Sequence, residues 1–206
     1  MPDGDQDIKR GRKFEQVIEG AREVFLKDGF DGASVDDIAK VAGVSKATLY
    51  SYFPDKRLLF MEVARIECQV QAENISSRVD LSLSLRDMLT FAAREFIEIL
   101  TRPFNRRMYR MCVAEAERFP AVGEQFYTCG PANARMKIGS FLKKYVERGE
   151  LDIEDFDLAA DQFEVLCKAD IVDRGLFLNQ SEFTEAEKKR VADGAVEMFL
   201  ARYGVK

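Results

Sequence analysis

The amino-acid sequence predicts an all-α protein of about nine helices. Apolar residues recur at three- and four-residue spacing through most of the chain, which is typical of helices that bury one face. Ser or Thr stands three residues ahead of an acidic residue at several helix starts, as in an N-cap, and Gly and Pro separate the stretches. Residues 80–85 alternate with period two, but Ser84 followed by Asp87 is a capping box. We therefore expect a loop and then a helix there.

The first helix is expected over residues 13–28. Residues 1–10 precede it and are polar with mixed charge; the stretch MPDGDQD, residues 1–7, is expected to be disordered. Gly29 is expected to end the helix, because glycine adopts the left-handed conformation of a C′ residue without strain. The apolar face of this helix consists of Phe14, Val17, Ile18, Ala21, Val24 and Phe25. We expect this face to pack behind the helices that follow.

Residues 34–56 predict a short helix, a tight turn and a second short helix. Ser34 can cap the first helix, with Asp37 as the second member of a capping box, and Ser45 can cap the second helix. Gly43 supplies the positive φ that the reversal needs. The apolar residues that face one another across the turn are Ile38, Ala39, Val44, Leu49 and Phe53. The pattern therefore predicts a helix-turn-helix.

The outer face of the second short helix is polar and small. At about 100° per residue, it consists of Lys46, Ala47, Tyr50 and Ser51. Such a face suits the major groove of B-DNA, with phosphate contacts from polar groups around it. The candidate DNA-contacting residues are Ser34, Ser45, Lys46, Ala47, Thr48, Tyr50, Ser51, Tyr52 and Lys56. An ordinary αα-hairpin that binds no DNA is the alternative interpretation.

From Ala21 to Phe60 the chain reads AxxVFLxxGFxxxSVxDIAxxAGVSKATLYSYFPDKxxLF, which closely resembles the N-terminal domain of the TetR family of transcriptional regulators. The resemblance implies a three-helix DNA-binding domain followed by a helical domain that holds an inducer and forms a homodimer. In the family, a basic arm ahead of the first helix often reaches the DNA. The corresponding residues here are Lys9, Arg10, Arg12 and Lys13, with a solvated tail as the alternative.

The remaining helices are expected over residues 55–76, 84–102, 103–118, 121–147, 156–178 and 184–203, with a break near Gly130-Pro131 and a capping box from Thr184 to Glu187. The stretches 114–132 and 149–163 resemble the AefR-like C-terminal domain of certain TetR regulators. We divide the chain into a DNA-binding domain, residues 1–56, and a ligand-binding and dimerisation domain, residues 57–206.

The composition argues against several functions. A net charge of −5 is unlike that of a protein that coats nucleic acid through bulk charge. There is no histidine, and the four cysteines, Cys68, Cys112, Cys129 and Cys167, form no CxxC pair. We therefore expect no zinc site, no cofactor and no Ser-His-Asp or Cys-His catalytic arrangement. No signal peptide or membrane span is expected, so we expect a cytoplasmic protein with reduced thiols that is not an enzyme.

The family resemblance implies an effector pocket in the second domain. Its candidate lining residues are Met88, Phe91, Phe96, Phe104, Met108, Met111, Cys112, Phe141, Phe163 and Cys167. Such a lining suits an apolar or aromatic effector, but Met and Phe at helical spacing are also the pattern of a plain core. The basic stripe formed by Arg102, Arg106, Arg107 and Arg110 is expected to be either a solvated face or a site for an anionic group.

Dimerisation is expected through the last two helices, because a lone three-helix domain contacts few bases and gains specificity from two symmetry-related half-sites. The candidates are Leu158, Val165, Leu166, Ala169, Val172, Leu176, Val191, Ala195, Met198 and Phe199. We expect a ligand-responsive repressor of a palindromic double-stranded DNA operator, with the helix 55–76 as a lever between the domains. The alternatives are an architectural DNA-binding protein with a protein partner and a helical protein whose helix-turn-helix is vestigial.

Overall fold

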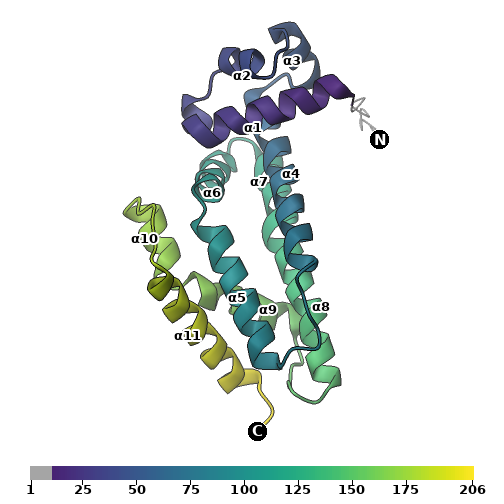
Figure 1. Cartoon of the computed structure of the whole chain (residues 1–206), viewed down its shortest axis with the longest axis vertical. Helices are drawn as coiled ribbons and strands as arrows, with labels where there is room; N and C mark the ends of the chain where they lie inside the picture. Colours follow the sequence, from purple (N-terminus) through teal and green to yellow (C-terminus); the bar gives the residue numbers. More distant parts are fainter. Residues whose placement is uncertain (1–10) are drawn as a thin grey trace.

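The computed structural model describes residues 11–206 as an elongated stack of helices, with the N-terminal helices lying across one end (Figure 1). The elements are α1 (Arg12–Gly32), α2 (Val35–Val41), α3 (Lys46–Tyr52), α4 (Lys56–Ser76), α5 (Leu85–Thr101), α6 (Pro103–Glu115), α7 (Pro120–Tyr127), the π-helical turn η1 (Thr128–Ala132), α8 (Asn133–Glu147), α9 (Phe156–Lys168), α10 (Ile171–Phe177) and α11 (Glu185–Tyr203). The all-α prediction is confirmed. Within residues 11–206 the β pairing is limited to one isolated bridge between Leu151 and Gly204.

The helix boundaries follow the predicted ones except near the C-terminal end. The break expected near Pro131 is present as η1, because proline lacks the N–H group that a regular helix needs. The helix expected over 156–178 is instead divided into α9 and α10 at Asp170, whose φ of 63° does not continue an α-helix. The predicted disorder of residues 1–7 lies outside the described residues.

Side-chain caps fix where several helices begin. The hydroxyl groups of the capping residues accept hydrogen bonds from backbone N–H groups three residues further on, as predicted; they are Ser34, Ser45, Ser84 and Thr184. At α11 the capping box is complete, because the Glu187 carboxylate accepts from the backbone N–H of Thr184 at 2.8 Å. This hydrogen bond, and then the guanidinium of Arg174, hold the pKa of Glu187 at about 2.

Glycines set the path of the chain around the N-terminal helices. Gly29 has a φ of 73° inside α1, so the regular helix stops there as predicted before a last turn that ends at Gly32. Gly43 has a φ of 64° between α2 and α3, a conformation that strains L side chains. Gly20 acts through its size: a Cβ atom there would lie 2.7 Å from the backbone N of Ala42. Glycine therefore lets α1 cross close behind the turn.

An aromatic core, which we name the upper core, joins α1, α2 and α3 to α4, α6 and α7. The ring of Phe60 lies edge-on to Phe25 at 4.9 Å and to Phe30 at 5.2 Å, and Phe104 of α6 reaches it at 5.9 Å between centroids. The buried residues of this core are Phe14, Val17, Ile18, Ala21, Val24, Phe25, Ala33, Ile38, Ala39, Leu49, Phe53, Leu59, Phe60, Met61, Val63, Ala64, Phe104, Met108, Met111, Cys112 and Val122. The upper core thus extends beyond residue 56, and the domain boundary drawn there stays a prediction.

A second core, the lower core, lies among α5, α8, α9 and α11. Phe199 packs edge-on against Phe163 at 5.3 Å and against Tyr203 at 4.8 Å, and the hydroxyl of the buried Tyr145 donates to the carbonyl oxygen of Leu83 at 3.0 Å. Buried side chains of α5, α9 and α11 make up most of it. Each described helix that contributes buried residues to these cores contributes them to only one of the two.

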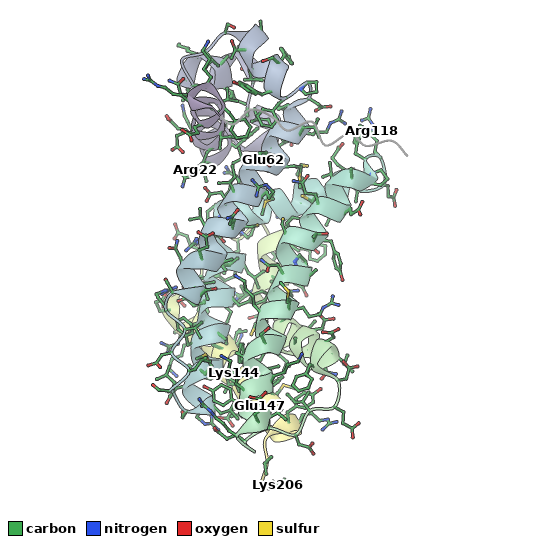
Figure 2. All side chains as sticks on the ribbon, turned by 90° about the vertical axis from the view of Figure 1, so that its right-hand side faces the viewer. Arg22, Glu62, Arg118, Lys144, Glu147 and Lys206 are labelled. Carbon is green, nitrogen blue, oxygen red and sulfur yellow. The ribbon has the colours of Figure 1, made fainter. Side chains whose placement is uncertain are left out.

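Helix α4 runs from the N-terminal helices down one side of the molecule (Figure 1). Arg22 of α1 hydrogen-bonds to Glu67 of α4, and Arg107 of α6 donates to the carbonyl oxygen of Leu26 at 3.2 Å. Figure 2 shows Arg22 and Glu62 at the level where the N-terminal helices meet α4, and Lys144 near the opposite end of the molecule. Helix α4 is thus linked to α1 by a side-chain contact.

Candidate functional site

The helix-turn-helix predicted from residues 34–56 is present as α2, the turn at Gly43, and α3. Ile38 of α2 and Leu49 and Phe53 at α3 are buried in the upper core, as predicted. The backbone N–H of Val44 donates to the carbonyl oxygen of Ala39 at 3.0 Å and closes the turn. The inner side of α3 is therefore held by apolar contacts, which leaves its outer side free.

The outer side of α3, which we name the reader surface, consists of the exposed residues Lys46, Ala47, Tyr50 and Ser51. Tyr50 is 48% exposed although it is a large aromatic residue. The hydroxyls of Ser45 and Thr48 lie 2.9 Å apart at the start of the helix, and Lys46 forms an ion pair with Asp36 of α2. The predicted direction of these side chains is confirmed, and their contact with DNA stays a prediction.

The side chains of Tyr52 and Lys56 contact other parts of the N-terminal helices and do not belong to the reader surface. The half-buried ring of Tyr52 lies edge-on to Phe14 at 5.7 Å. The Nζ of Lys56 donates to the carbonyl oxygens of Phe30 at 2.8 Å and Ala33 at 3.0 Å, beside the ring of Phe30. Its ammonium group thus satisfies carbonyls at the end of α1 with two of its three donors, and its contact with a phosphate stays a prediction.

The predicted basic arm is described only in part. Arg12 and Lys13 are exposed at the start of α1. Lys9 and Arg10 lie outside the described residues. The described part of the arm thus places two cationic side chains at the beginning of the helix that supports α2 and α3.

A cavity of about 610 Å³ lies between the upper and lower cores. Helices α4, α5, α6, α8, α9 and α10 and the turn η1 all contribute to its wall. The predicted lining residues that the structure places there are Met88, Phe91, Phe96, Met108 and Phe141. The volume lies within the range of sites for small organic molecules, about 300–1,000 Å³.

Five other residues expected in the pocket lie outside its wall. Phe104, Met111 and Cys112 are buried in the upper core, and Phe163 and Cys167 are buried in the lower core. Helical spacing identifies the apolar side of a helix but not whether that side meets a neighbouring helix or an empty space. The alternative that the sequence left open, a plain core, is therefore correct for these five residues.

The sequence interpretation missed the contribution of α4. Its cavity-lining residues are Cys68, Gln71, Ala72, Ile75 and Ser76. The amide of Gln71 accepts from the Nδ2 of Asn105, at 3.2 Å, and the same Nδ2 donates to the carbonyl oxygen of Ile99 at 2.8 Å. Polar residues at inward-facing positions, such as Gln71 and Asn105, were the available signal, because buried amides require partners.

The cavity wall also holds a buried acidic residue. Glu164 is 4% exposed, and its Oε1 atom has no hydrogen-bond partner. Its Oε2 atom lies 3.6 Å from the Nζ of Lys168. Burial raises the pKa of Glu164, and Lys168 opposes this effect. The mainly apolar wall thus carries a buried carboxyl group on its α9 side, in addition to Glu95 on α5.

Two arginines of the predicted basic stripe, Arg106 and Arg110, contact a neighbouring helix. Arg106 and Arg110 both donate to carbonyl oxygens at the end of α10, among them that of Gly175, which lies 2.9 Å from Nη2 of Arg110. Burial and the neighbouring arginines lower the pKa of Arg106. These side chains hold α10 against α6, because a helix C-terminus presents unpaired carbonyl groups.

The expected dimerisation residues fall into three groups. Val191, Ala195 and Phe199 are buried in the lower core, and the partly buried Leu166 packs against it. Val172 and Leu176 line the cavity. Those left exposed on α9 and α11 are Leu158, Val165, Ala169 and Met198. Helices α9 and α11 pack against each other.

Membrane-spanning helices and metal-binding clusters are both absent from the described residues. No helix within residues 11–206 is long and apolar enough to cross a bilayer. The same residues contain no cluster of three or more Cys, Asp or Glu side chains arranged to hold a metal ion.

A helix-turn-helix with a free outer face, joined by one long helix to a body with a cavity, defines a DNA-binding regulator. Residues 17–63 match the family described as bacterial regulatory proteins, tetR family, and residues 87–205 match the AefR-like transcriptional repressor C-terminal domain. The chain belongs to the TetR family of bacterial transcriptional regulators. It is a site-specific DNA-binding protein of the helix-turn-helix type.

Individual relatives agree with this assignment. The HTH-type transcriptional regulator LuxR of Vibrio harveyi is 26% identical over 174 residues, which cover 84% of each chain. The crystal structure of a TetR-family regulator from Mesorhizobium loti has a TM-score of 0.83 and 31% identity, and the match covers 94% of this chain and 98% of that one. The flavonoid-responsive regulator FrrA has a TM-score of 0.73 and 32% identity, with 95% and 99% covered.

Proposed function

We propose that this protein is a repressor that binds a palindromic operator as a homodimer and releases it when a small apolar or aromatic molecule occupies the cavity. One observation carries the proposal: α4 follows α3 after only Phe53, Pro54 and Asp55, and it also forms a wall of the cavity. A ligand that favours one position of α4 thereby favours one position of the reader surface. Only a difference in affinity between the two positions produces this coupling.

The DNA contacts follow from the reader surface. Lys46, Tyr50 and Ser51 are exposed and polar, and Ala47 adds a methyl group that suits thymine. Ser34, Ser45, Thr48 and Tyr52 surround this surface at positions suited to the DNA backbone. When Lys46 contacts the DNA, it gives up its ion pair with Asp36. The loss of this ion pair offsets part of the binding free energy that the DNA contact contributes.

The lining of the cavity supports an aromatic or apolar effector with few polar groups. Aromatic rings from α5, α6, α7 and α8 line it, among them Phe91, Tyr109, Phe126 and Phe141. FrrA, a relative by fold and sequence, is described as flavonoid-responsive. A planar aromatic molecule is accordingly the class of effector that we propose.

The dimer is proposed through the face of α9 and α11 that carries Leu158, Val165 and Met198, which are 51%, 63% and 62% exposed. Two copies joined through this face bury apolar side chains that a monomer leaves in water. We expect Met198→Asp to shift sedimentation equilibrium toward the monomer. Val113→Asp, at a position that is 59% exposed on α6, is the matched control and leaves the oligomeric state unchanged.

The experiment that tests the function measures fluorescence anisotropy with the DNA upstream of the gene and with a scrambled fragment, over a series of salt concentrations. A site-specific repressor binds the upstream fragment selectively, with a log–log salt slope of about −0.9 for each phosphate neutralised. Flavonoids and other planar aromatics are then screened for release of the fragment. Ala92→Phe, which fills space in the cavity wall, should retain DNA binding and lose the ligand response.

Two results count against this proposal. Equal and weak binding to both fragments at all salt concentrations favours the architectural DNA-binding protein, which occupies many equivalent sites. Release by a ligand that is unaffected by Ala92→Phe contradicts the assignment of the cavity. The size of the cavity already favours a small-molecule effector over the architectural alternative.

A further inference from the structure

Two cysteines from different elements meet in the wall of the cavity. Cys68 lies on α4, Cys129 lies in η1, and both line the cavity. The side chains of Cys68 and Cys129 are close enough to influence each other's ionisation, and α4 packs against η1. Both side chains are half-buried, whereas Cys112 and Cys167 are 2% and 0% exposed. The chain therefore contains one adjacent, accessible pair of thiols and two isolated ones in the cores.

Cys129 is also accessible from outside the cavity. It lines a separate surface cleft of about 300 Å³ together with Arg65, Thr128 and residues of α7. Cys129 thus stands between solvent on one side and the apolar cavity on the other. A small oxidant reaches its sulfur without unfolding of either core, which is the first requirement for selective oxidation.

The surroundings of the two thiols assign different roles to them. The hydrogen bond from Cys68 lowers the pKa of Cys129, and the guanidinium of Arg65 acts in the same direction. The same hydrogen bond, together with burial, raises the pKa of Cys68. Burial raises the pKa of Cys112 and of Cys167 to about 12. Cys129 is therefore the thiol that ionises first, and the thiolate is the form that attacks an oxidant.

The backbone at Cys129 is suited to local movement. Its hydrogen bonds follow the π-helical pattern of η1, and Pro131 inside that turn leaves one N–H group absent. Single π-helical turns occur often at functional sites, because they are less stable than the α-helix around them. A small displacement of Cys129 toward α4 therefore requires no break in a regular helix.

We propose that Cys68 and Cys129 form a dithiol site that peroxides convert to an intramolecular disulfide, which ties α4 to η1. In the first step the Cys129 thiolate attacks the O–O bond of the peroxide. An S–O bond forms, the O–O bond breaks, and the leaving hydroxide or alkoxide takes up a proton. The sulfur is oxidised to a sulfenic acid and the peroxide is reduced to water or an alcohol.

In the second step Cys68 loses its proton and attacks the sulfenic sulfur. The S–S bond forms, the S–O bond breaks, and hydroxide leaves with that proton as water. The two steps together convert two thiols and one peroxide into a disulfide, one water and one water or alcohol. Hydrogen peroxide entering by the cleft and an organic hydroperoxide entering by the apolar cavity share this chemistry.

The disulfide has a structural consequence that rests on the proposed function. Closing the bond fixes the two sulfur atoms at about 2.05 Å and so ties α4 to η1 in one geometry. Because α4 also supports the reader surface, the oxidised protein should bind the operator at least about tenfold more weakly than the reduced protein, a change of about 1.4 kcal/mol by the standard conversion. Reduction with dithiothreitol should restore the affinity.

The disulfide is tested first by mass, without DNA. The folded protein is treated with hydrogen peroxide or with cumene hydroperoxide and then blocked with iodoacetamide. We expect a loss of about 2 Da and a linked peptide that joins Cys68 to Cys129. Faster reaction with cumene hydroperoxide assigns entry through the cavity, and faster reaction with hydrogen peroxide assigns entry through the cleft. A disulfide between other cysteines, between two chains, or none at all overturns the proposal.

Four single variants separate the roles of the thiols. Cys129→Ser should form neither the sulfenic acid nor the disulfide, whereas Cys68→Ser should accumulate a sulfenic acid on Cys129 that dimedone traps. Cys112→Ser and Cys167→Ser are the matched controls and should form the disulfide at the rate of the parent protein. Each variant is accepted only with the circular dichroism of the parent. Equal oxidation of all four cysteines in the folded protein contradicts the selectivity.

The measurement of operator affinity and the mapping of the disulfide-linked peptide test different parts of the proposal. If the disulfide forms and the operator affinity of the oxidised protein is unchanged, the regulatory consequence is wrong. If the reduced protein binds no specific DNA, the proposed function fails while the mapping of Cys68 and Cys129 still decides the dithiol site. The two failures are therefore distinguishable.

Discussion

The reader end of the molecule and the cavity-bearing body are stabilised in different ways. At the reader end, contacting aromatic rings fill the upper core, and α2 and α3 are only seven residues each. In the body, longer helices enclose a cavity of about 610 Å³ that carries the buried carboxyl of Glu164. A solid core holds a recognition surface in one geometry, whereas a cavity leaves its walls free to adjust to a ligand.

The difference shows how one chain combines rigid recognition with a response. Helix α4 contributes Phe60 and Met61 to the upper core and Gln71 and Ile75 to the cavity wall. Met108 of α6 belongs to both as well. The two regions are therefore distinct in packing but share α4, α6 and α7. Substitutions can test what each region does.

The largest effect is expected from Phe60→Ala in the upper core. The ring is 1% exposed and contacts three other aromatic rings, so its removal leaves a cavity. We expect a loss of about 3–5 kcal/mol in the free energy of unfolding, measured by chemical denaturation. Phe177→Ala is the matched control, because its ring is 82% exposed and its loss should cost less than about 0.5 kcal/mol. Similar losses for the two variants contradict the described core.

Tyr50→Ala tests the division between the two regions most directly. Tyr50 on the reader surface and Tyr109 in the cavity wall are 48% and 44% exposed. We expect Tyr50→Ala to weaken operator binding by about 1–3 kcal/mol with unchanged ligand affinity and helicity. Tyr109→Ala should change the ligand response and leave operator affinity in the absence of ligand unchanged. Unchanged operator affinity in Tyr50→Ala means that another face of α3 contacts the DNA.

A smaller effect is expected from the N-cap of α3. The Ser45 hydroxyl accepts from the backbone N–H of Thr48 at 3.0 Å, and Ser84 makes the equivalent bond to Asp87 at 3.2 Å at the start of α5. Each Ser→Ala variant should lose about 1 kcal/mol of stability in thermal denaturation. Only Ser45→Ala should also weaken operator binding, because its helix carries the reader surface. Equal operator affinities for the two variants argue against that role.

The smallest effect is expected from Glu164→Gln, and its sign depends on pH. Burial raises the pKa of this carboxyl above its ordinary value of 4.5, so between the two values the folded state binds more protons than the unfolded state. The contribution of Glu164 to stability is then fully present at low pH and is lost as pH rises through the folded-state pKa. Glu164→Gln should therefore gain in melting temperature relative to the parent on going from acidic to neutral pH.

The control for this measurement is Glu182→Gln, which removes one negative charge at an exposed position. Differential scanning fluorimetry of both variants over the same pH series gives the comparison. A gain of the same size in both variants assigns the effect to net charge rather than to burial in the cavity wall.

Local features were predictable from the sequence because short stretches of chain decide them. The caps at Ser34, Ser45 and Thr184 need partners only three residues away, and the conformation at Gly43 depends on the absence of a side chain. Helical spacing likewise placed Leu49 inward and Tyr50 outward. The all-α fold, the helix-turn-helix and the direction of its reader surface follow from such local rules.

Only the tertiary structure decided what the inward-facing residues meet. Phe104 and Phe163 have the same apolar spacing as Phe91, yet the first two fill cores and the third faces the cavity. The Lys56 ammonium is taken up by carbonyl groups of Phe30 and Ala33, far back along the chain. These outcomes depend on how whole helices pack, and that packing joins residues across the chain by contacts that no local pattern encodes.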